Sequence, residues 1–378
     1  MGRIISYISI LILTFIFAYV FPVDESYILF YMVVLIPIFD IITFIYFKRN
    51  ISIEVNVSDN EIEKNDNVIY RITIKNKGII PIPFVDYEIE NSGNLERDEP
   101  NFKRISIGPR SIMKELLIFK GIHVGEGFLN LERIQLLSIF GLFRSPIEFQ
   151  GNSKIIIKPR TENIDGMEKF IENTFSIEDD DSCSDYNYLG EAGYEYREYI
   201  PGDPLNRVNW KLSSKENNKL IIRKSVSVLR CNKTIIIDPL VEKDDRYYYN
   251  LDLLLEGTIS LVNEFILGEY EVSVLYRDNG RWTENLIKDN VHIENLQRRL
   301  SKINILDVNI KNRFNGVANY IESKNNIIIV TTNNDKEINN LVNEIINVND
   351  YISIISNVKD NIVENQYYLS NDYRLVRV

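Results

Sequence analysis

The chain has 378 residues, of which 45% are hydrophobic, and its formal net charge is -11. This length is enough for more than one buried core, whereas the acidic balance argues against nonspecific nucleic-acid binding, which needs basic surface to replace phosphate counterions. Cys183 and Cys231 are the only cysteines and His123 and His292 the only histidines, so neither a disulfide framework nor a histidine-based zinc site is expected.

Two long apolar runs open the chain, from Ile4 to Phe21 and from Tyr27 to Phe47. Each is long enough to cross the hydrocarbon core of a bilayer as a helix. The first run is not interpreted as a cleaved signal peptide, because it ends in a poor cleavage site and a second run follows at once. We therefore predict a two-helix membrane anchor over residues 1–50.

The charges around these runs predict their orientation. Arg3 precedes the pair and Lys48-Arg49 ends it, while acidic residues lie between the two runs. Because basic flanks favour the cytoplasmic side, we expect a multi-pass protein of the inner (plasma) membrane with both termini in the cytoplasm.

Asp40 interrupts the second run. An acid within a membrane segment is a functional candidate by default. It lies only about two helical turns from Lys48, however, so we interpret it as a side chain that snorkels toward the inner interface.

Hydrophobic and polar residues alternate along the next hundred positions, for example around Val68, Tyr70 and Ile72. Turn signals containing glycine separate these runs, and helical spacing is absent. Short alternating strands at this spacing predict an immunoglobulin-like β-sandwich of about seven strands over residues 51–150. Since it holds no cluster of catalytic side chains, we interpret it as a spacer or docking module.

Residues 151–230 are interpreted as a linker with one dense motif. The acidic loop from Glu178 to Asp185 lacks the glycine and final glutamate of a calcium loop, and we read it as a solvated linker. Further on, Asp203 before Pro204 is the order of an N-cap and a first helical residue, which predicts a helix from Pro204 to about Glu216.

This predicted helix has two faces. Leu205, Val208 and Leu212 have the spacing of a buried face. The exposed side is expected to carry a basic stripe flanked by Trp210, and its members are Arg207, Lys211 and Lys215.

Ten residues of this region stand at fixed spacings: Glu195, Arg197, Tyr199, Pro201, Gly202, Asp203, Arg207, Trp210, Lys211 and Ser213. They resemble the signature of a bacterial family, the domain of unknown function 58. The segments Phe140–Phe143 (FGLF) and Lys158-Pro159 are similar to two further elements of that family. The family pattern has acids where this chain has Pro204 and Asn209, so a role that needs a carboxylate at position 209 does not carry over; Lys215 likewise replaces an arginine.

Strand and helix patterns alternate over residues 231–378. Apolar strands are predicted at 234–237, 271–276, 326–331 and 351–356, and helices at 251–267, 291–302 and 337–348. This order predicts a mostly parallel sheet covered on both faces, with a ligand crevice beyond the strand ends, near Asp238 and Thr332.

The family resemblance implies that this last segment is a von Willebrand factor type A-like domain, which can carry a metal-ion-dependent adhesion site. Such a site needs two serines in a D-x-S-x-S pattern after the first strand. Here Asp238 is followed by Pro-Leu-Val-Glu, and Thr332-Asn333 stands where an acidic ligand is expected. We therefore expect no metal and no cofactor, and interpret Asp238 as a strand-end or capping residue.

The favoured function is a non-enzymatic, membrane-anchored scaffold or adaptor that binds a cytoplasmic protein partner. The resemblance implies a MoxR-type AAA+ ATPase as that partner and a role at the cell envelope. A basic, aromatic-flanked helix on an acidic protein suits docking of an acidic surface. Arg197 and Arg207 can also pair with acids of the motif and lock it in place, and the two roles are compatible. The acids available for this are Glu195, Glu198 and Asp203.

The alternative is a hydrolase in which Ser213 or Ser214 is activated by Lys211 or Lys215. A serine nucleophile needs a base within hydrogen-bond reach and a third group that orients this base. No glycine turn presents either serine, so the scaffold is preferred.

Overall fold

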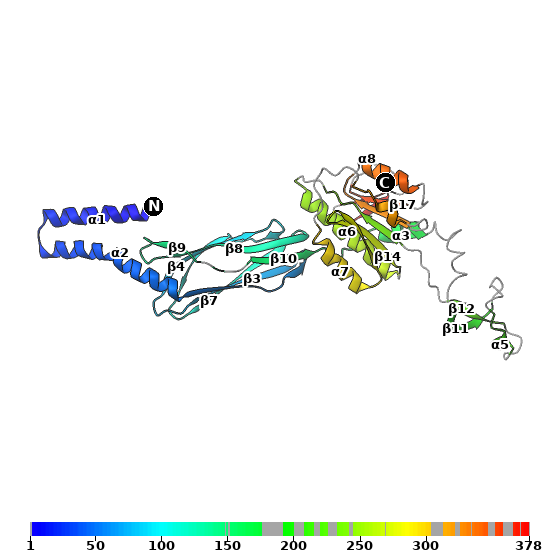
Figure 1. The fold of residues 1–378 in the computed structure, drawn as a ribbon, viewed down its shortest axis with the longest axis horizontal. Helices are drawn as coiled ribbons and strands as arrows, with labels where there is room; N and C mark the ends of the chain where they lie inside the picture. Colours follow the sequence, from blue (N-terminus) through cyan, green and yellow to red (C-terminus); the bar gives the residue numbers. More distant parts are fainter. Residues whose placement is uncertain are drawn as a thin grey trace. The chain divides into compact units, whose positions relative to one another are not determined.

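The computed structural model divides the chain into two compact units, Met1–Lys158 and Pro159–Val378 (Figure 1). The described residues are 2–147, 149, 152–175, 192–199, 208–214, 220–225, 233–241, 245–268, 270–303, 313–321, 326–333, 335–346, 352–357, 366–370 and 372–377.

Two helices begin the first unit, α1 (Gly2–Val20) and α2 (Asp24–Asn50). They form an antiparallel hairpin in which the Tyr7 hydroxyl donates to the carbonyl of Val33 at 3.1 Å. In the described part of the chain, α2 is the one helix that is long and apolar enough to cross a membrane. The apolar part of α1, Ile4–Val20, is shorter, so its crossing stays a prediction.

The last part of α2 belongs to the folded domain that follows it. Asp40, Thr43 and Phe47 are buried at i, i+3 and i+7, which places them on one face of the helix. Phe47 has no exposed surface and is a member of the domain's hydrophobic core. Within the predicted span, the helix face that carries Asp40, Thr43 and Phe47 is thus covered by protein and is not open to lipid.

Asp40 does not snorkel as expected. Its carboxylate accepts a hydrogen bond from the Ser138 hydroxyl at 2.6 Å and another from the amide of Phe140 at 3.1 Å, and its side chain is fully buried. Both donors lie at the start of the loop that contains the FGLF segment. The carboxylate thus fastens this loop to α2, since a buried acid is stable only when donors meet it.

The domain is a sandwich of two sheets around one core. Its strands are β1 (Ile51–Val57), β2 (Glu61–Glu63), β3 (Asn67–Asn76), β4 (Ile82–Asn91), β5 (Leu95–Glu96), β6 (Phe102–Ile107), β7 (Ile112–Gly121), β8 (Gly125–Leu137), β9 (Arg144–Pro146) and β10 (Asn152–Lys158). One sheet has the order β1-β3-β7-β5; the other has the order β2-β10-β8-β4-β6, with β9 on β8. Because β10 pairs with β8 and β2, the domain ends at Lys158 instead of residue 150.

The second unit is built on a seven-stranded sheet of order β15-β14-β13-β16-β17-β18-β19. Its strands are β13 (Lys233–Ile237), β14 (Val272–Asp278), β15 (Arg281–Ile287), β16 (Asn326–Thr331), β17 (Ile352–Ser356), β18 (Gln366–Leu369) and β19 (Leu375–Arg377). Neighbours from β14 to β18 are parallel, and the two outermost strands are antiparallel.

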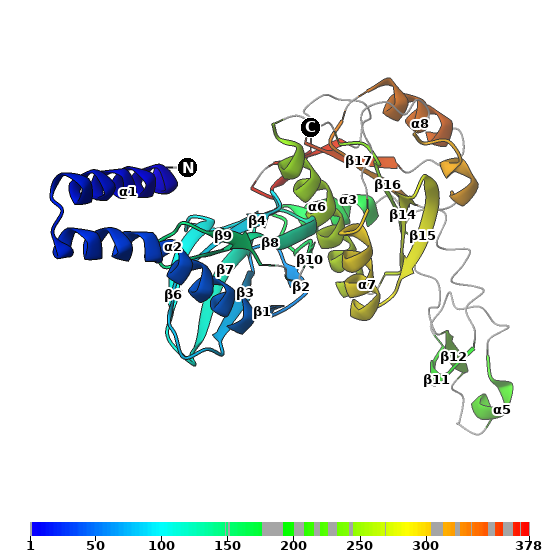
Figure 2. The same ribbon diagram turned by 60° about the vertical axis from the view of Figure 1, so that its left-hand side comes forward.

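Helices cover both faces of this sheet, as Figure 2 shows. The helices are α3 (Met167–Phe175), α6 (Tyr247–Leu267), α7 (Asn290–Leu300), the 3-10 helix η2 (Val317–Tyr320) and α8 (Lys336–Ile346). Helices α6 and α7 contact each other, whereas Leu341 of α8 and Val317 of η2 share one core with Ile236 and Ile329 of the sheet. The predicted strand at 326–331 is confirmed without a shift.

Candidate functional site

The carboxyl edge of the second sheet brings two distant strand ends together. The chain passes from β13 to β14 on one side and later returns to β16 on the other side of β13. Parallel sheets of this kind bind ligands at such a switch point. The Thr331 hydroxyl at the end of β16 donates to Asp238 after β13 at 2.7 Å, so the edge lies where the sequence predicts it, beside Thr332.

An arginine occupies the space at this edge. The Arg313 guanidinium donates to both oxygens of Asp238, from Nε at 2.8 Å and from Nη2 at 3.1 Å. It also donates to both oxygens of Asp335, at 2.6 and 3.0 Å. Arg313 and Asp238 are buried, with side-chain exposures of 4% and 0%. One cation therefore joins two carboxylates in two bidentate pairs, which is the arrangement that suits a guanidinium best.

Neighbouring groups complete this network. The backbone amide of Leu240 donates to Asp238 at 3.1 Å, and the side-chain amide of Asn333 donates to the carbonyl of Leu240 at 2.7 Å. The Asp335 carboxylate caps α8, because it also accepts from the amides of Glu337 and Ile338 at 3.2 Å each. Hydrogen bonds thus connect Asp238 at the end of β13, the capping residue Asp335 of α8 and the Arg313 side chain in one network.

The two carboxylates feel opposite electrostatic effects. Burial raises the pKa of Asp238, and the facing guanidinium, the Thr331 hydroxyl and the Leu240 amide oppose this rise. Partial burial would also raise the pKa of Asp335, but the hydrogen bond and the charge of Arg313 hold that pKa below its ordinary value. The pKa of Arg313 is raised despite its burial, because both carboxylates stabilise its charged form.

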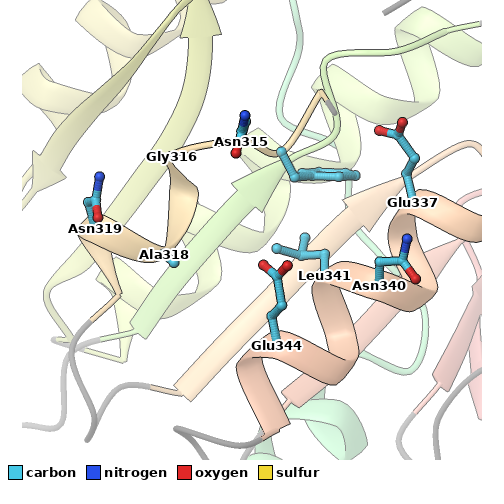
Figure 3. A pocket seen from close by; sticks show the side chains of 9 residues that line it. Asn315, Gly316, Ala318, Asn319, Glu337, Asn340, Leu341 and Glu344 are labelled. Carbon is cyan, nitrogen blue, oxygen red and sulfur yellow. The ribbon is translucent and has the colours of Figure 1, made fainter. Parts of the chain in front are cut away.

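A groove of about 420 Å³ lies beside this network, between η2 and α8 (Figure 3). Its lining combines carboxylates and amides with the ring of Phe314: Phe314, Asn315, Gly316, Ala318, Asn319, Glu337, Asn340, Leu341 and Glu344. In Figure 3, Glu337 and Glu344 project from α8. The groove offers hydrogen-bond acceptors and a negative field, but it holds no nucleophile with an adjacent base.

The expectation that Asp238 binds no metal stays a prediction. Among the described residues, no three His, Cys, Asp or Glu side chains form a group suited to a metal ion. What the structure adds is that a guanidinium already neutralises Asp238, so a cation there would have to displace a buried arginine.

The ten motif residues are only partly described. Pro201, Gly202, Asp203 and Arg207 lie outside the described residues, as do the side chains of Glu195, Arg197 and Trp210. The described parts are the strands β11 (Ala192–Glu198) and β12 (Ile221–Ser225), which pair antiparallel, and the short helix α5 (Trp210–Ser213).

Helix α5 begins later than predicted. The backbone amide of Asn209 donates to the carbonyl of Ile221 at 2.8 Å, and Val208 lies in a β-bridge, so neither residue is helical. The side-chain oxygen of Asn209 accepts from the amide of Leu212 at 3.2 Å and so caps the helix. The predicted helix is therefore not continuous from Pro204 to Trp210, because the bond to Ile221 keeps Asn209 out of a helix; Asp203, Pro204 and Glu216 lie outside the described residues.

Ser213 holds α5 against β12. Its hydroxyl accepts a hydrogen bond from the amide of Ile221 at 2.8 Å. The neighbouring Ser214 hydroxyl donates to the carbonyl of Lys211 at 3.0 Å, while the Lys211 side chain is exposed. Because Val208 and Asn209 are not helical, Arg207 and Lys211 cannot share one continuous helix as predicted; Lys215 lies outside the described residues, so its place in the stripe stays a prediction.

The sequence did not point to Arg313 or Asp335 as site residues. Arg313 lies 75 positions from Asp238, and no local pattern marks it. A signal for Asp335 was present, because Asp before Lys-Glu and an apolar run is typical of a helix start.

Comparisons with known proteins give distant similarities. No protein-family model matches the chain, and no curated protein matches it. Among solved structures, alpha-2-macroglobulin from Escherichia coli is 12% identical over 30% of this chain and 17% of its own, with a TM-score of 0.23. A CARDB domain from Pyrococcus furiosus is 13% identical over 29% of this chain and 94% of its own, with a TM-score of 0.21. A cohesin from Archaeoglobus fulgidus is 13% identical over 28% of this chain and 91% of its own, also with a TM-score of 0.21. Similarities of this size establish no function.

Proposed function

We propose that this chain is a membrane-anchored scaffold whose cytoplasmic part holds a protein partner without transforming it. The observation that carries the proposal is the continuity of α2 with the sandwich. Asp40 is bonded to the loop after β8, and Phe47 is part of the sandwich core. Because the apolar helix α2 is fixed to the sandwich in this way, the membrane anchor and the first domain would be rigidly connected.

The orientation and the second anchor helix are parts of the same proposal. Helix α1 would cross beside α2, with Arg3 and Lys48-Arg49 on the cytoplasmic side of the inner membrane. The hairpin contact between Tyr7 and Val33 supports paired helices. Both termini would then be cytoplasmic.

The domain types are also proposed. The order β15-β14-β13-β16-β17-β18, with an antiparallel strand at β15, supports a von Willebrand factor type A-like domain. The two-sheet architecture of residues 51–158 supports an immunoglobulin-like sandwich.

The motif around α5 would combine a lock and a docking surface. Asn209 and Ser213 bond to the backbone of β12, which is the role of a lock. Lys211 is exposed and remains available to a carboxylate of the partner. The resemblance of the motif favours a MoxR-type AAA+ ATPase as that partner, in a process of the cell envelope.

The serine bonds support a scaffold over a hydrolase. The hydroxyls of Ser213 and Ser214 bond to backbone groups in the described part of the chain, whereas a nucleophile needs a bond to its base. Treatment with broad serine-hydrolase probes tests this point, and labelling that Ser213→Ala abolishes would favour the enzyme.

Capture of a co-expressed MoxR-type ATPase by the full chain tests the docking role. Lys211→Glu should abolish capture and leave the circular dichroism spectrum unchanged, because the side chain is exposed. Lys302→Glu, also at an exposed lysine of the second unit, is the matched control and should capture normally. Equal capture by both variants would contradict docking at α5.

A further inference from the structure

The two ends of the sandwich differ in charge. Three loops lie at the end where α2 enters, 77–81, 108–111 and 138–143, and their sequences contain no Asp or Glu. This end carries exposed basic residues instead: Lys48, Arg49, Lys77, Arg110 and Arg144. None of the five makes an ion pair within the described part of the chain. Their charges are therefore available to an outside anion.

The opposite end of the sandwich is acidic. Its loops lie between β1 and β2, β2 and β3, β4 and β6, and β7 and β8. Their exposed acids are Asp59, Asp66, Glu96, Asp98 and Glu99. The separation of charge on a chain of net charge -11 gives the domain a basic end and an acidic end.

The basic end also exposes large apolar side chains. Ile79, in the loop between β3 and β4, is 63% exposed, and Phe140, in the loop between β8 and β9, is 48% exposed. The backbone of each is fixed to α2, because the Ile79 amide donates to the Tyr46 hydroxyl and the Phe140 amide to Asp40. Aromatic and aliphatic groups with basic neighbours are typical of surfaces that lie in a membrane interface.

Exposed apolar surface on α2 continues beside these loops. Ile41, Ile42 and Ile45 lie beyond Asp40 and are 41–62% exposed. Ile45 is five residues past Asp40, or about 7.5 Å along the helix axis at 1.5 Å per residue. If lipid covers these side chains, the loops bonded at Asp40 and Tyr46 must lie where hydrocarbon gives way to headgroups.

We infer that the basic end of the sandwich, with Phe140 and Ile79 at its tip, is seated in the headgroup layer of an anionic bilayer. This inference rests on the proposed anchorage by α2 and goes beyond it, because an anchored domain can also stand clear of the lipid. The seated loops would fix the tilt of the sandwich, and anionic lipid would neutralise Lys77, Arg110 and their neighbours.

Tryptophan quenching in vesicles tests the inference. The full chain with Phe140→Trp is reconstituted into phosphatidylcholine–phosphatidylglycerol vesicles that contain lipids brominated on their acyl chains. The control is Phe102→Trp, whose parent side chain is 52% exposed on β6, away from the basic end. After subtraction of the signal of Trp210 and Trp282, position 140 should be quenched and blue-shifted, and position 102 should not.

Charge reversal separates lipid recognition from simple proximity. Lys77→Glu with Arg110→Glu should lower the quenching at position 140 in the anionic vesicles to that seen in pure phosphatidylcholine. Lys120→Glu with Lys154→Glu, at exposed positions elsewhere on the sandwich, should leave it unchanged. Equal loss in both pairs, or no loss in either, would overturn the role of the basic end.

Vesicle flotation distinguishes failure of the proposed anchorage by α2 from failure of the proposed seating in the headgroup layer. If the chain floats with the vesicles and position 140 is no more quenched than position 102, the anchorage stands and the seating is wrong. If the chain does not float, the anchorage itself is wrong and the seating falls with it.

Discussion

Two fully buried aspartates, Asp40 in the first unit and Asp238 in the second, are stabilised in different ways. Asp40 accepts hydrogen bonds from a hydroxyl and a backbone amide. Asp238 faces the guanidinium of Arg313, which is itself buried. The difference teaches that a buried carboxylate can fasten a loop through neutral donors. With a buried cation as its partner, however, the charges depend on one another: loss of Arg313 leaves Asp238 without a counter-charge, and loss of Asp238 leaves Arg313 with Asp335 alone.

The largest effect is expected from Asp238→Ala. Removal of one partner of a buried ion pair typically costs about 3–5 kcal/mol. Arg313 keeps its pair with the partly exposed Asp335, so we expect a loss near the lower end of that range. Trp282 stacks on Phe314, next to Arg313, with ring centroids 6.3 Å apart, so its fluorescence reports urea unfolding of this region. Asp245→Ala, at an exposed acid of the same unit, is the control. Equal midpoints for the two variants would show that the pair does not stabilise the unit.

The double variant Asp238→Leu with Arg313→Met sharpens the same point. Replacement of a whole buried ion pair by apolar groups of similar size is often neutral, since both desolvation costs disappear together. We expect the double variant to regain most of the stability lost in Asp238→Ala, although Asp335 then loses its partner as well. A double variant less stable than the single one would contradict this mutual dependence.

A smaller effect is expected from Asp40→Ala. Hydrogen bonds to a charged group contribute about 1.5–3 kcal/mol, and here Ser138 and the amide of Phe140 lose their acceptor. Hydrogen exchange of the full chain in nanodiscs should show faster exchange in the loop from 138 to 143. Asp24→Ala, at an exposed acid of the same helix, should leave that rate unchanged.

Acidification should weaken the Arg313 network through Asp335. Since the pKa of Asp335 is lowered in the folded state, its stabilisation is present above the ordinary carboxyl pKa and is lost as the pH falls through the lower folded value. The raised pKa of Asp238 acts with the opposite sign, so Asp335→Asn isolates the contribution of Asp335. The variant should show a shallower acid decline in unfolding midpoint as the pH falls below the ordinary carboxyl pKa. An unchanged slope would contradict this assignment.

The smallest effect is expected from Tyr87→Phe. Tyr87 carries a buried hydroxyl, in contrast to the buried carboxylates of Asp40 and Asp238. Its hydroxyl makes no hydrogen bond within the described part of the chain, and burial raises its pKa to about 12. A hydroxyl buried without a partner contributes no net stability, so its removal should be neutral or stabilising by up to about 1 kcal/mol. A clear loss in the thermal midpoint of the sandwich would reveal a partner for this hydroxyl.

Local patterns predicted the elements well where they were strong. The apolar run at 326–331 forms β16 as predicted, and the predicted helix at 291–302 is close to the observed α7. The hairpin of β14 and β15 was missed, although Asn279-Gly280, both with positive φ, is a recognised hairpin signal. The correct predictions and the missed hairpin all concern signals between residues that are close together in the sequence.

Local patterns could not predict the contacts of Asp40 or those at the candidate site, because the partners lie far apart in the sequence. Asp40 meets Ser138 across 98 positions, and Asp238 meets Arg313 across 75. A carboxylate in a sequence has no visible partner at such a distance, so Asp40 was interpreted as snorkelling. The predicted continuous helix from Pro204 failed for the same reason, because the bond of Asn209 to Ile221 joins residues that are 12 positions apart and leaves no local signal.

Cysteine labelling along α2 tests the central claim, that this helix leaves the membrane already bonded to the sandwich. In a background with Cys183→Ser and Cys231→Ser, single cysteines are placed at Thr43, which is 4% exposed, at Ile42, which is 62% exposed, and at Lys48. We predict that a water-soluble maleimide labels position 48 in vesicles and in detergent, and position 42 only in detergent. Position 43 should be labelled in neither, because protein covers it. Labelling of position 43 as fast as position 48 would contradict the account.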